Sequence, residues 1–499
     1  MEIENIIGCI RKNSKIFLNI SLLILSFSLI KAFDAPSSLM NLLFLVFFFI
    51  NFTISPKYSY LLYIPFSLFF EHNSSFEIST NIFLPISTKM MLFKNWTDVF
   101  YNEIYKFSSF DIILLTYVLY FLMQKFYFKN GTRIHHFNVI FWGYLSYLLV
   151  FTLWGFMHDS DPFAAYWQIK PLAYLPIIYI LTYYFIERIN DIYIILSAIL
   201  TVTLLKLSQT YYFAYAIAPQ LAEKLRALSL SHEETLFYIL IGFFLFFACI
   251  FSKRKTIVFV CGIMTFMSLG GLVHANRRIS FALLACYMAI VSLFYRGPKQ
   301  IQIRAILGIV LLVMLSLFIL LVLSPARLPL SDTAKSIATG LGRFTSPEYA
   351  RDFSSNYYRE IERANLRLNI KDNFWGVGFG AQLAEEYEQY VHYIDEDIFS
   401  HNQILQIWAL TGVPGFILFL SFWAWIISYI SFLHKNSKEA VFSALCICVI
   451  CYIVAYLLYS YYEMMLTEFR QNIMLGILIA SVFKLKELTS DQNISTLSP

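Results

Sequence analysis

Residues 400–415 read Ser-His-Asn-Gln-Ile-Leu-Gln-Ile-Trp-Ala-Leu-Thr-Gly-Val-Pro-Gly, and the rest of the chain is organised around them. Ser400 and Gln403 have the spacing of a capping box, which predicts a helix that begins here with His401 in its first turn. The Gly-Val-Pro-Gly end limits that helix to about three turns. An apolar run at 416–430 follows directly. We therefore expect a short helix at a membrane surface, a bend, and then a spanning helix.

The position of His401 suggests two interpretations. An imidazole at a helix N-terminus lies in positive partial charge, which favours its neutral form near pH 7. A neutral imidazole beside a membrane can accept a proton, so His401 is a candidate general base. The alternative is an interfacial histidine without a chemical role.

The composition defines the class of protein. Of the 499 residues, 59% are hydrophobic, 18% are aromatic and only 14% are charged. A soluble chain of this length cannot bury so much apolar surface, so we expect an all-α polytopic membrane protein. All seven cysteines lie in or beside apolar segments and are expected to be packing residues rather than metal or redox sites.

The apolar runs predict about fourteen membrane spans. Eleven fall within 1–324 and three within 403–486. The N-terminal run resembles a signal peptide but lacks a small-x-small cleavage site, so we expect an uncleaved first span. The runs lie at about 16–31, 39–55, 57–70, 110–126, 137–156, 171–187, 190–206, 233–252, 256–272, 279–295, 303–324, 415–432, 440–460 and 467–483.

Charge placement orients these spans. If the chain starts in the cytoplasm, every predicted cytoplasmic connection is short and basic, as the positive-inside rule requires. Both termini are then cytoplasmic, and residues 487–499 form a disordered tail. The long outward segments are 71–109, 157–170, 207–232 and 325–402, of which the last is a large, partly helical loop.

Two cations face outward against this bias. Arg277 and Arg278 stand at the outer end of one predicted span. A charge at a membrane-embedded helix end is costly unless it is paired, so these arginines are functional candidates. Snorkelling to lipid phosphates is the alternative.

A second group of cations lies in the large outer loop. Residues 357–370 have helical spacing, which places on one face Arg359, Arg363 and Arg367. Like charges at this spacing repel, and neighbouring glutamates would offset the repulsion. Alternatively the stripe faces an anion, because the planar fork of arginine binds a diphosphate bidentately.

Three further features lie near these groups. Glycines at 376, 378 and 380 predict a tight loop packed beside the site rather than a nucleotide loop. Glu463 and Arg470 open the last span and pair either with each other or with the earlier arginines. Lys170 is another possible anion contact. The acidic residues of the outer loops are expected to be solvated, without a bound metal.

These motifs together resemble the bacterial O-antigen ligase and O-antigen polymerase family. His401-Asn402, nine residues, Gly412, two residues and Gly415 is similar to its signature. The outward arginine, the arginine-rich helix before the glycine turn, and the acidic residue with an arginine at the last span extend the likeness over roughly 140–485. At two points the register departs from the family: we favour Arg278 over its neighbour, and Arg359 although Tyr358 occupies the usual place.

The resemblance implies a metal-independent inverting transferase of the glycosyltransferase-C type, without a cofactor. It would take an undecaprenyl-diphosphate-linked glycan at the periplasmic face of the inner membrane and would bind no nucleic acid. The acceptor would be lipid A–core or a second lipid-linked glycan. The implied catalytic residues are His401, Arg278 and Arg359. The implied substrate-binding residues are Arg277, Arg363, Arg367, Asn402, Glu463, Arg470 and Lys170.

Several functions fit this resemblance. A ligase is slightly favoured because the matching elements follow the ligases through the last three spans, and a polymerase is the alternative. Two additional N-terminal spans have no counterpart in the compact ligases. A glycolipid flippase would place charges at the bilayer midplane and often shows internal repeats. Here the charges gather at the outer face. Protein oligosaccharyltransferases of the family usually carry a C-terminal soluble extension, which we do not expect here.

Overall fold

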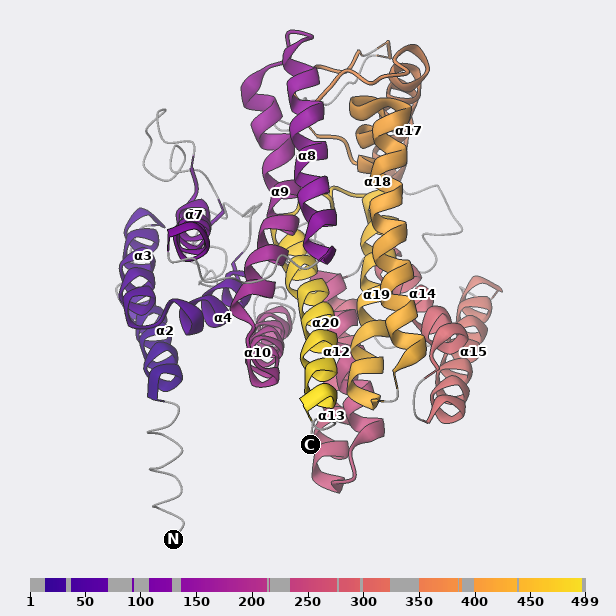
Figure 1. Ribbon diagram of the computed structural model, residues 1–499. Coiled ribbons are helices and arrows are strands. Elements are labelled where there is room, and N and C mark those ends of the chain that lie inside the picture. The colour runs from indigo at the N-terminus through magenta and orange to yellow at the C-terminus, as the bar shows by residue number, and fades with distance from the viewer. Residues whose placement is uncertain are drawn as a thin grey trace. The chain divides into compact units, whose positions relative to one another are not determined.

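The regular secondary structure of this protein is helical wherever the computed structural model describes it (Figure 1). This confirms the expected all-α class for the described residues. They are 14–32, 37–70, 92–93, 107–127, 136–212, 215, 234–275, 278–296, 299–323, 350–384, 386–387, 399–437 and 439–495.

Within this part, 7 helical segments are long and apolar enough to cross a membrane. The chain is therefore a polytopic membrane protein, while the count of fourteen spans and their orientation stay predictions. The segments belong to α7 (Ser109–Leu122) with the π-helical turn Met123–Tyr127, α8 (His136–Phe156), α10 (Ile189–Tyr212), α12 (Glu234–Phe251), α13 (Lys255–Ala275), α18 (Gln403–Asn436) and α19 (Ala440–Ser460).

The chain divides into two compact units. The first comprises 1–135, 177–209 and 483–499. Its N-terminal helices are α2 (Ser14–Ala32), α3 (Ser37–Ile54) and α4 (Pro56–Ser67). An aromatic core joins α3 and α4 to α7, with the ring centroids of Phe48 and Tyr117 5.5 Å apart and those of Tyr60 and Tyr117 5.0 Å apart. Because α4 has 12 residues and rises about 18 Å, it is too short for the span expected at 57–70.

The second unit comprises 136–176 and 210–482 and holds every predicted site residue. In Figure 1, α12 packs along α13, and α18 packs along α19. The helix α19 is buried along most of its length, and its three cysteines are free thiols enclosed by apolar side chains, as expected of packing residues. The same unit also contains the apolar helices α14 (Arg278–Phe294) and α15 (Gln300–Leu323).

Three segments of secondary structure bear on the predicted loops. The helix α17 (Ala350–Asp372) lies within the segment expected to form the large outer loop, and it packs on α18. The helix α9 (Pro162–Phe185) includes 162–170, which we expected in a loop. The last helix, α20 (Phe469–Ser495), continues to Ser495, so the expectation of a disordered tail is wrong for 487–495.

Candidate active site

The helix α18 is broken where the sequence predicted. Gly412 has φ 64° and ψ −172°, which no helical residue adopts, and Pro414 lacks an amide hydrogen. Trp408 and Phe416 stack with centroids 4.7 Å apart and planes at 3°. Eight residues of straight helix would separate them by about 12 Å along the axis. The bend therefore folds the first segment of α18, residues 403–411, back toward the second.

A glycine loop, residues 374–380, satisfies the backbone groups that the bend frees. The amides of Val377 and Gly378 donate to the carbonyls of Ala409 and Leu410 at 3.4 and 2.7 Å. In return the amide of Val413 donates to the carbonyl of Phe374 at 2.9 Å. Buried backbone groups without such partners would be costly. The loop and the bend therefore form one hydrogen-bonded unit.

Only glycine fits at the contact between the loop and the bend. Gly376 has φ 76°, and a Cβ atom there would lie 2.3 Å from the amide nitrogen of Gly412. A Cβ atom on Gly412 would lie 2.3 Å from the carbonyl oxygen of Phe374. The loop also bonds two other helices. The amide of Phe379 donates to the carbonyl of Phe151 in α8 at 3.1 Å, and the amide of Gly380 donates to Gln168 Oε1 in α9 at 2.8 Å. This confirms the tight loop expected from the glycine spacing.

The start of α18 differs from the predicted capping box. Asn402 is the N-cap, and its Oδ1 accepts the amide of Leu405 at 3.1 Å. Ser400 instead accepts the amide of Asn402 at 3.1 Å. The side chain of Gln403 turns to the segment before α20, where it bonds Leu466 and Thr467. His401 therefore precedes the helix and is not in its first turn.

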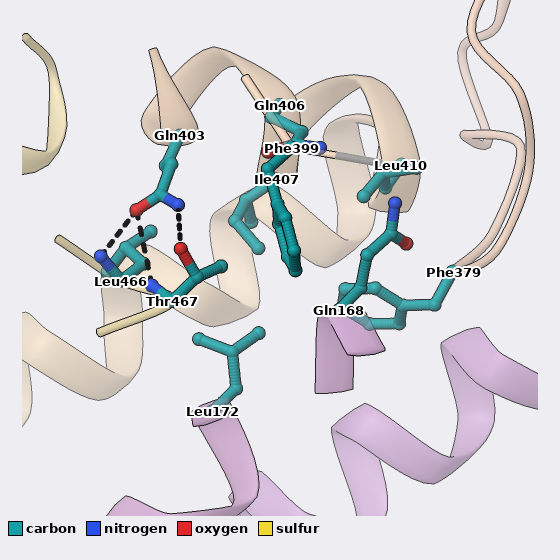
Figure 2. Close-up of a pocket in the computed structure, with 10 residues that line it drawn as sticks. All are labelled: Gln168, Leu172, Phe379, Phe399, Gln403, Gln406, Ile407, Leu410, Leu466 and Thr467. Carbon is teal, nitrogen blue, oxygen red and sulfur yellow. Dashed lines mark hydrogen bonds between the residues drawn. The ribbon is translucent and has the colours of Figure 1, made fainter. Parts of the chain in front are cut away.

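Figure 2 shows a small pocket beside the first segment of α18, between α9, the glycine loop and the segment before α20. The side chain of Gln406 accepts the amide of Ser400 at 3.1 Å. With Gln168 and Gln403, it holds the ends of four segments together through buried amide groups. Of these contacts, the one between Gln406 and Ser400 fixes the backbone beside His401.

His401 lies against α17. Its backbone amide donates to Glu362 Oε1 at 2.8 Å, and its Nδ1 is 3.6 Å from the same oxygen. That separation is too long for a hydrogen bond, so the attraction between the two side chains is electrostatic. The ring of Tyr358 packs edge-on against the imidazole, with centroids 5.8 Å apart. Glu362 is buried, and 21% of the His401 side chain is exposed.

The pKa of His401 is raised above its ordinary value. Burial acts to lower it and Arg359 opposes protonation, but the carboxylates of Glu362 and Glu463 outweigh both. The sequence argument from the helix terminus predicted a neutral form, and the direction of that argument is wrong. A neighbouring full negative charge exceeds the partial charge of a helix end.

Of the arginine stripe, only Arg359 makes an ion pair in the described structure. Its Nη2 lies 2.8 Å from Glu463 Oε1, and both side chains are partly exposed. Arg363 donates from Nε to the carbonyl of Arg359 at 3.0 Å, and Arg367 points to solvent. Glu463 therefore pairs with a loop arginine, and not with Arg470.

Arg470 is paired elsewhere. It is fully buried with Glu234 of α12, Nη1 to Oε1 at 3.5 Å. Tyr238 donates to the second carboxylate oxygen of Glu234 at 2.8 Å. The guanidinium also lies over the ring of Phe237, 5.8 Å from its centroid. This cluster joins the start of α20 to the start of α12.

The starts of four helices are connected in this way. Ser280 in α14 shares a hydrogen bond of 3.1 Å with Thr235 in α12. The ion pair of Glu234 with Arg470 connects α12 to α20, and the side chain of Gln403 connects the segment before α20 to α18. Helix starts carry positive partial charge, so their grouping favours an anion nearby.

The remaining predicted residues divide by what the structure describes. Arg278 is the first residue of α14, but its side chain and the whole of Arg277 lie outside the described part. Lys170 is buried in α9 with its Nζ over the rings of Tyr166, Trp167 and Phe469, at 5.4 to 5.5 Å. The Nδ2 of Asn402 is buried without a hydrogen-bond partner among the described residues.

Glu362 is the residue that sequence reasoning missed. From the sequence, the glutamates beside the arginine stripe, Glu360 and Glu362, are expected only to offset its charge repulsion. The position of Glu362 three residues after Arg359 places both on the side of α17 that meets His401. That spacing was a usable signal, but the burial of a carboxylate on a hydrophilic helix follows from tertiary packing alone.

A comparison with known families covers this part of the chain. The family model described as O-antigen ligase matches residues 263–420. The match includes the start of α14, all of α17, the glycine loop, His401 and the bend of α18. No curated protein matches the chain. Residues 263–420, about a third of the chain, thus match the O-antigen ligase family, and this match confirms the resemblance to the O-antigen ligase and polymerase family.

Proposed function

We propose that this protein is a glycosyltransferase-C-type enzyme of the inner membrane. It transfers a glycan from undecaprenyl diphosphate to an acceptor sugar hydroxyl at the periplasmic face. We favour lipid A–core as the acceptor, which makes the enzyme an O-antigen ligase. The observation that supports this proposal is a single cluster in which the imidazole of His401 lies beside the ion pair of Arg359 and Glu463.

His401 is proposed as the general base. It takes the proton of the acceptor hydroxyl while the hydroxyl oxygen attacks the anomeric carbon of the donor sugar. Attack from the face opposite the leaving group inverts that carbon. A base works best when its pKa lies near the working pH, and Glu362 raises the pKa of His401 in that direction. This step contributes about 10²–10⁴ in rate.

Arg359 and Arg278 are proposed to stabilise the leaving diphosphate. The bond from the anomeric carbon to the phosphate oxygen breaks, and undecaprenyl diphosphate departs with the electron pair. A well-placed donor to such a developing charge is worth about 10²–10³ in rate. Arg359 is partly exposed and is held by a carboxylate that it can share with, or exchange for, a phosphate.

Other cations are assigned weaker roles. Arg277, Arg363, Arg367 and Lys170 extend the positive field for the donor, and the buried Asn402, as the N-cap of α18, holds the backbone next to His401. The enclosed pair of Arg470 and Glu234 leaves no access for a ligand, so we assign Arg470 to holding α20 on α12.

Glycolipid profiling of cells that carry His401→Ala tests the proposal. We expect glycan transfer to fall by about 10²–10⁴-fold at unchanged protein level, because the acceptor hydroxyl loses its base. Glycan polymers that accumulate on the lipid carrier identify a ligase, whereas single repeats on the core identify a polymerase. Purified protein that moves the donor across vesicles without transferring the glycan contradicts the proposal and indicates a flippase.

A further inference from the structure

We infer that Glu362 is the positioning residue of His401: it orients the Nδ1 side of the imidazole and leaves Nε2 for the acceptor hydroxyl. This inference rests on the proposed function and deepens it. Glu362 does not touch the reacting atoms. It acts through the imidazole that does.

The geometry of one carboxylate oxygen supports this role. Glu362 Oε1 accepts the backbone amide of His401 at 2.8 Å and lies 3.6 Å from Nδ1 of the same residue. The first contact fixes the backbone, and the second places the negative charge of the carboxylate on the Nδ1 side of the ring. The ring of Tyr358, one turn earlier on α17, packs against the imidazole. Two side chains on one face of α17 therefore determine how the imidazole points.

The charges around Glu362 support the same assignment. Arg359 directs its guanidinium to Glu463, and Arg363 directs its Nε to a backbone carbonyl. The second oxygen of Glu362, Oε2, is buried without a hydrogen-bond partner among the described residues. A buried carboxylate is costly unless a positive charge compensates it.

That positive charge appears during the proposed reaction. When Nε2 takes the proton of the acceptor hydroxyl, the ring becomes an imidazolium next to the carboxylate. The charge is then stabilised by a group that was already in place, and no solvent has to reorganise. The carboxylate also favours the tautomer with its hydrogen on Nδ1, which is the tautomer whose Nε2 can accept a proton.

A purely structural role is the alternative. In that case Glu362 serves only as acceptor for the backbone amide of His401. The amide oxygen of glutamine would preserve that contact at the same length but would carry no charge. Glu362→Gln therefore separates the two roles. Glu360→Gln, on the exposed face of the same helix turn, is the matched control.

The test is the pH dependence of glycan transfer by the purified full-length enzyme in lipid nanodiscs, with lipid-linked glycan as donor. The base must be neutral, so transfer is lost as the pH falls through the pKa of His401. Glu362 raises that pKa, and Glu362→Gln should lower it. We expect the acidic limb to move to lower pH and the maximal rate to fall about 10- to 10³-fold. Arg359 and Glu463, the other charges that act on His401, are unchanged in both variants.

A Glu362→Gln limb that coincides with the wild-type and Glu360→Gln limbs overturns the inference. If Glu362→Gln does not fold, as judged by thermal melting, Glu362→Asp replaces it. This variant keeps the charge at greater distance, and an unmoved limb with an unmoved rate then counts against positioning. His401→Ala separates the two levels of argument: full transfer by that variant refutes the proposed function itself, whereas its loss together with a normal Glu362→Gln refutes only the role of Glu362.

Discussion

The second unit contains two arginine–glutamate pairs that differ in how they meet water. Arg359 and Glu463 are 2.8 Å apart with 26% and 18% of their side chains exposed. Arg470 and Glu234 are 3.5 Å apart with 0% and 2% exposed. The shorter pair is thus the accessible one. Burial, rather than distance, decides whether a guanidinium can exchange its partner for a substrate phosphate.

The largest effect is expected from breaking the buried pair. Arg470→Met leaves the Glu234 carboxylate enclosed without its cation, and such a loss costs about 3–5 kcal/mol. We expect a large fall in the melting temperature in detergent and little folded protein in cells. Adding Glu234→Gln to Arg470→Met should recover part of the stability, because the stranded charge is removed. Equal stability of the single and double variants would contradict a charge-based explanation.

The origin of these two pairs shows what the sequence can and cannot predict. Glycine and proline positions located the bend of α18, because they restrict the backbone locally. The partner of Arg470 is 236 residues away in the chain, and no local rule identifies it. Apolar runs likewise located the helices but not the charges buried between them.

The first residues of α9 and α18 carry local capping signals. Asp161 and Pro162 are an N-cap and a first-turn proline, and the Asp161 carboxylate accepts the amides of Phe163 and Ala164 at 2.9 and 3.3 Å. They start α9 inside an expected loop. At α18, Asn402 prevailed over Ser400 as the cap because Gln403 is engaged with the segment before α20. At α18, tertiary contacts therefore decide which of the two possible capping residues is used.

The accessible pair should respond in the opposite way, through activity rather than stability. Arg359→Ala removes a proposed donor to the diphosphate, and we expect a fall of about 10²–10³ in transfer rate. The cost in stability should stay within about 1 kcal/mol, because partly exposed pairs contribute little. Arg359→Lys keeps the positive charge but cannot make the bidentate hydrogen bond of arginine, so its transfer rate should lie between those of Arg359→Ala and wild type. Matched assays of rate and melting temperature on the same preparations check both expectations. A large loss of stability with normal transfer would place Arg359 in the same class as Arg470.

The smallest effect on stability is expected from Glu463→Gln. Its dependence on salt concentration distinguishes the accessible pair from the buried one. This substitution weakens the hold on Arg359 and should change stability by less than about 1 kcal/mol in 0.1 M salt. In 1 M salt the Debye length falls from about 10 to 3 Å, so the difference between wild type and Glu463→Gln should disappear. The destabilisation by Arg470→Met should persist at both concentrations, because solvent ions cannot enter a pair with 0% and 2% exposure. Melting temperatures of the three proteins at both salt concentrations make the comparison. A salt-sensitive Arg470→Met difference would mean that water reaches the buried pair, and the distinction between the two arginines would then no longer hold.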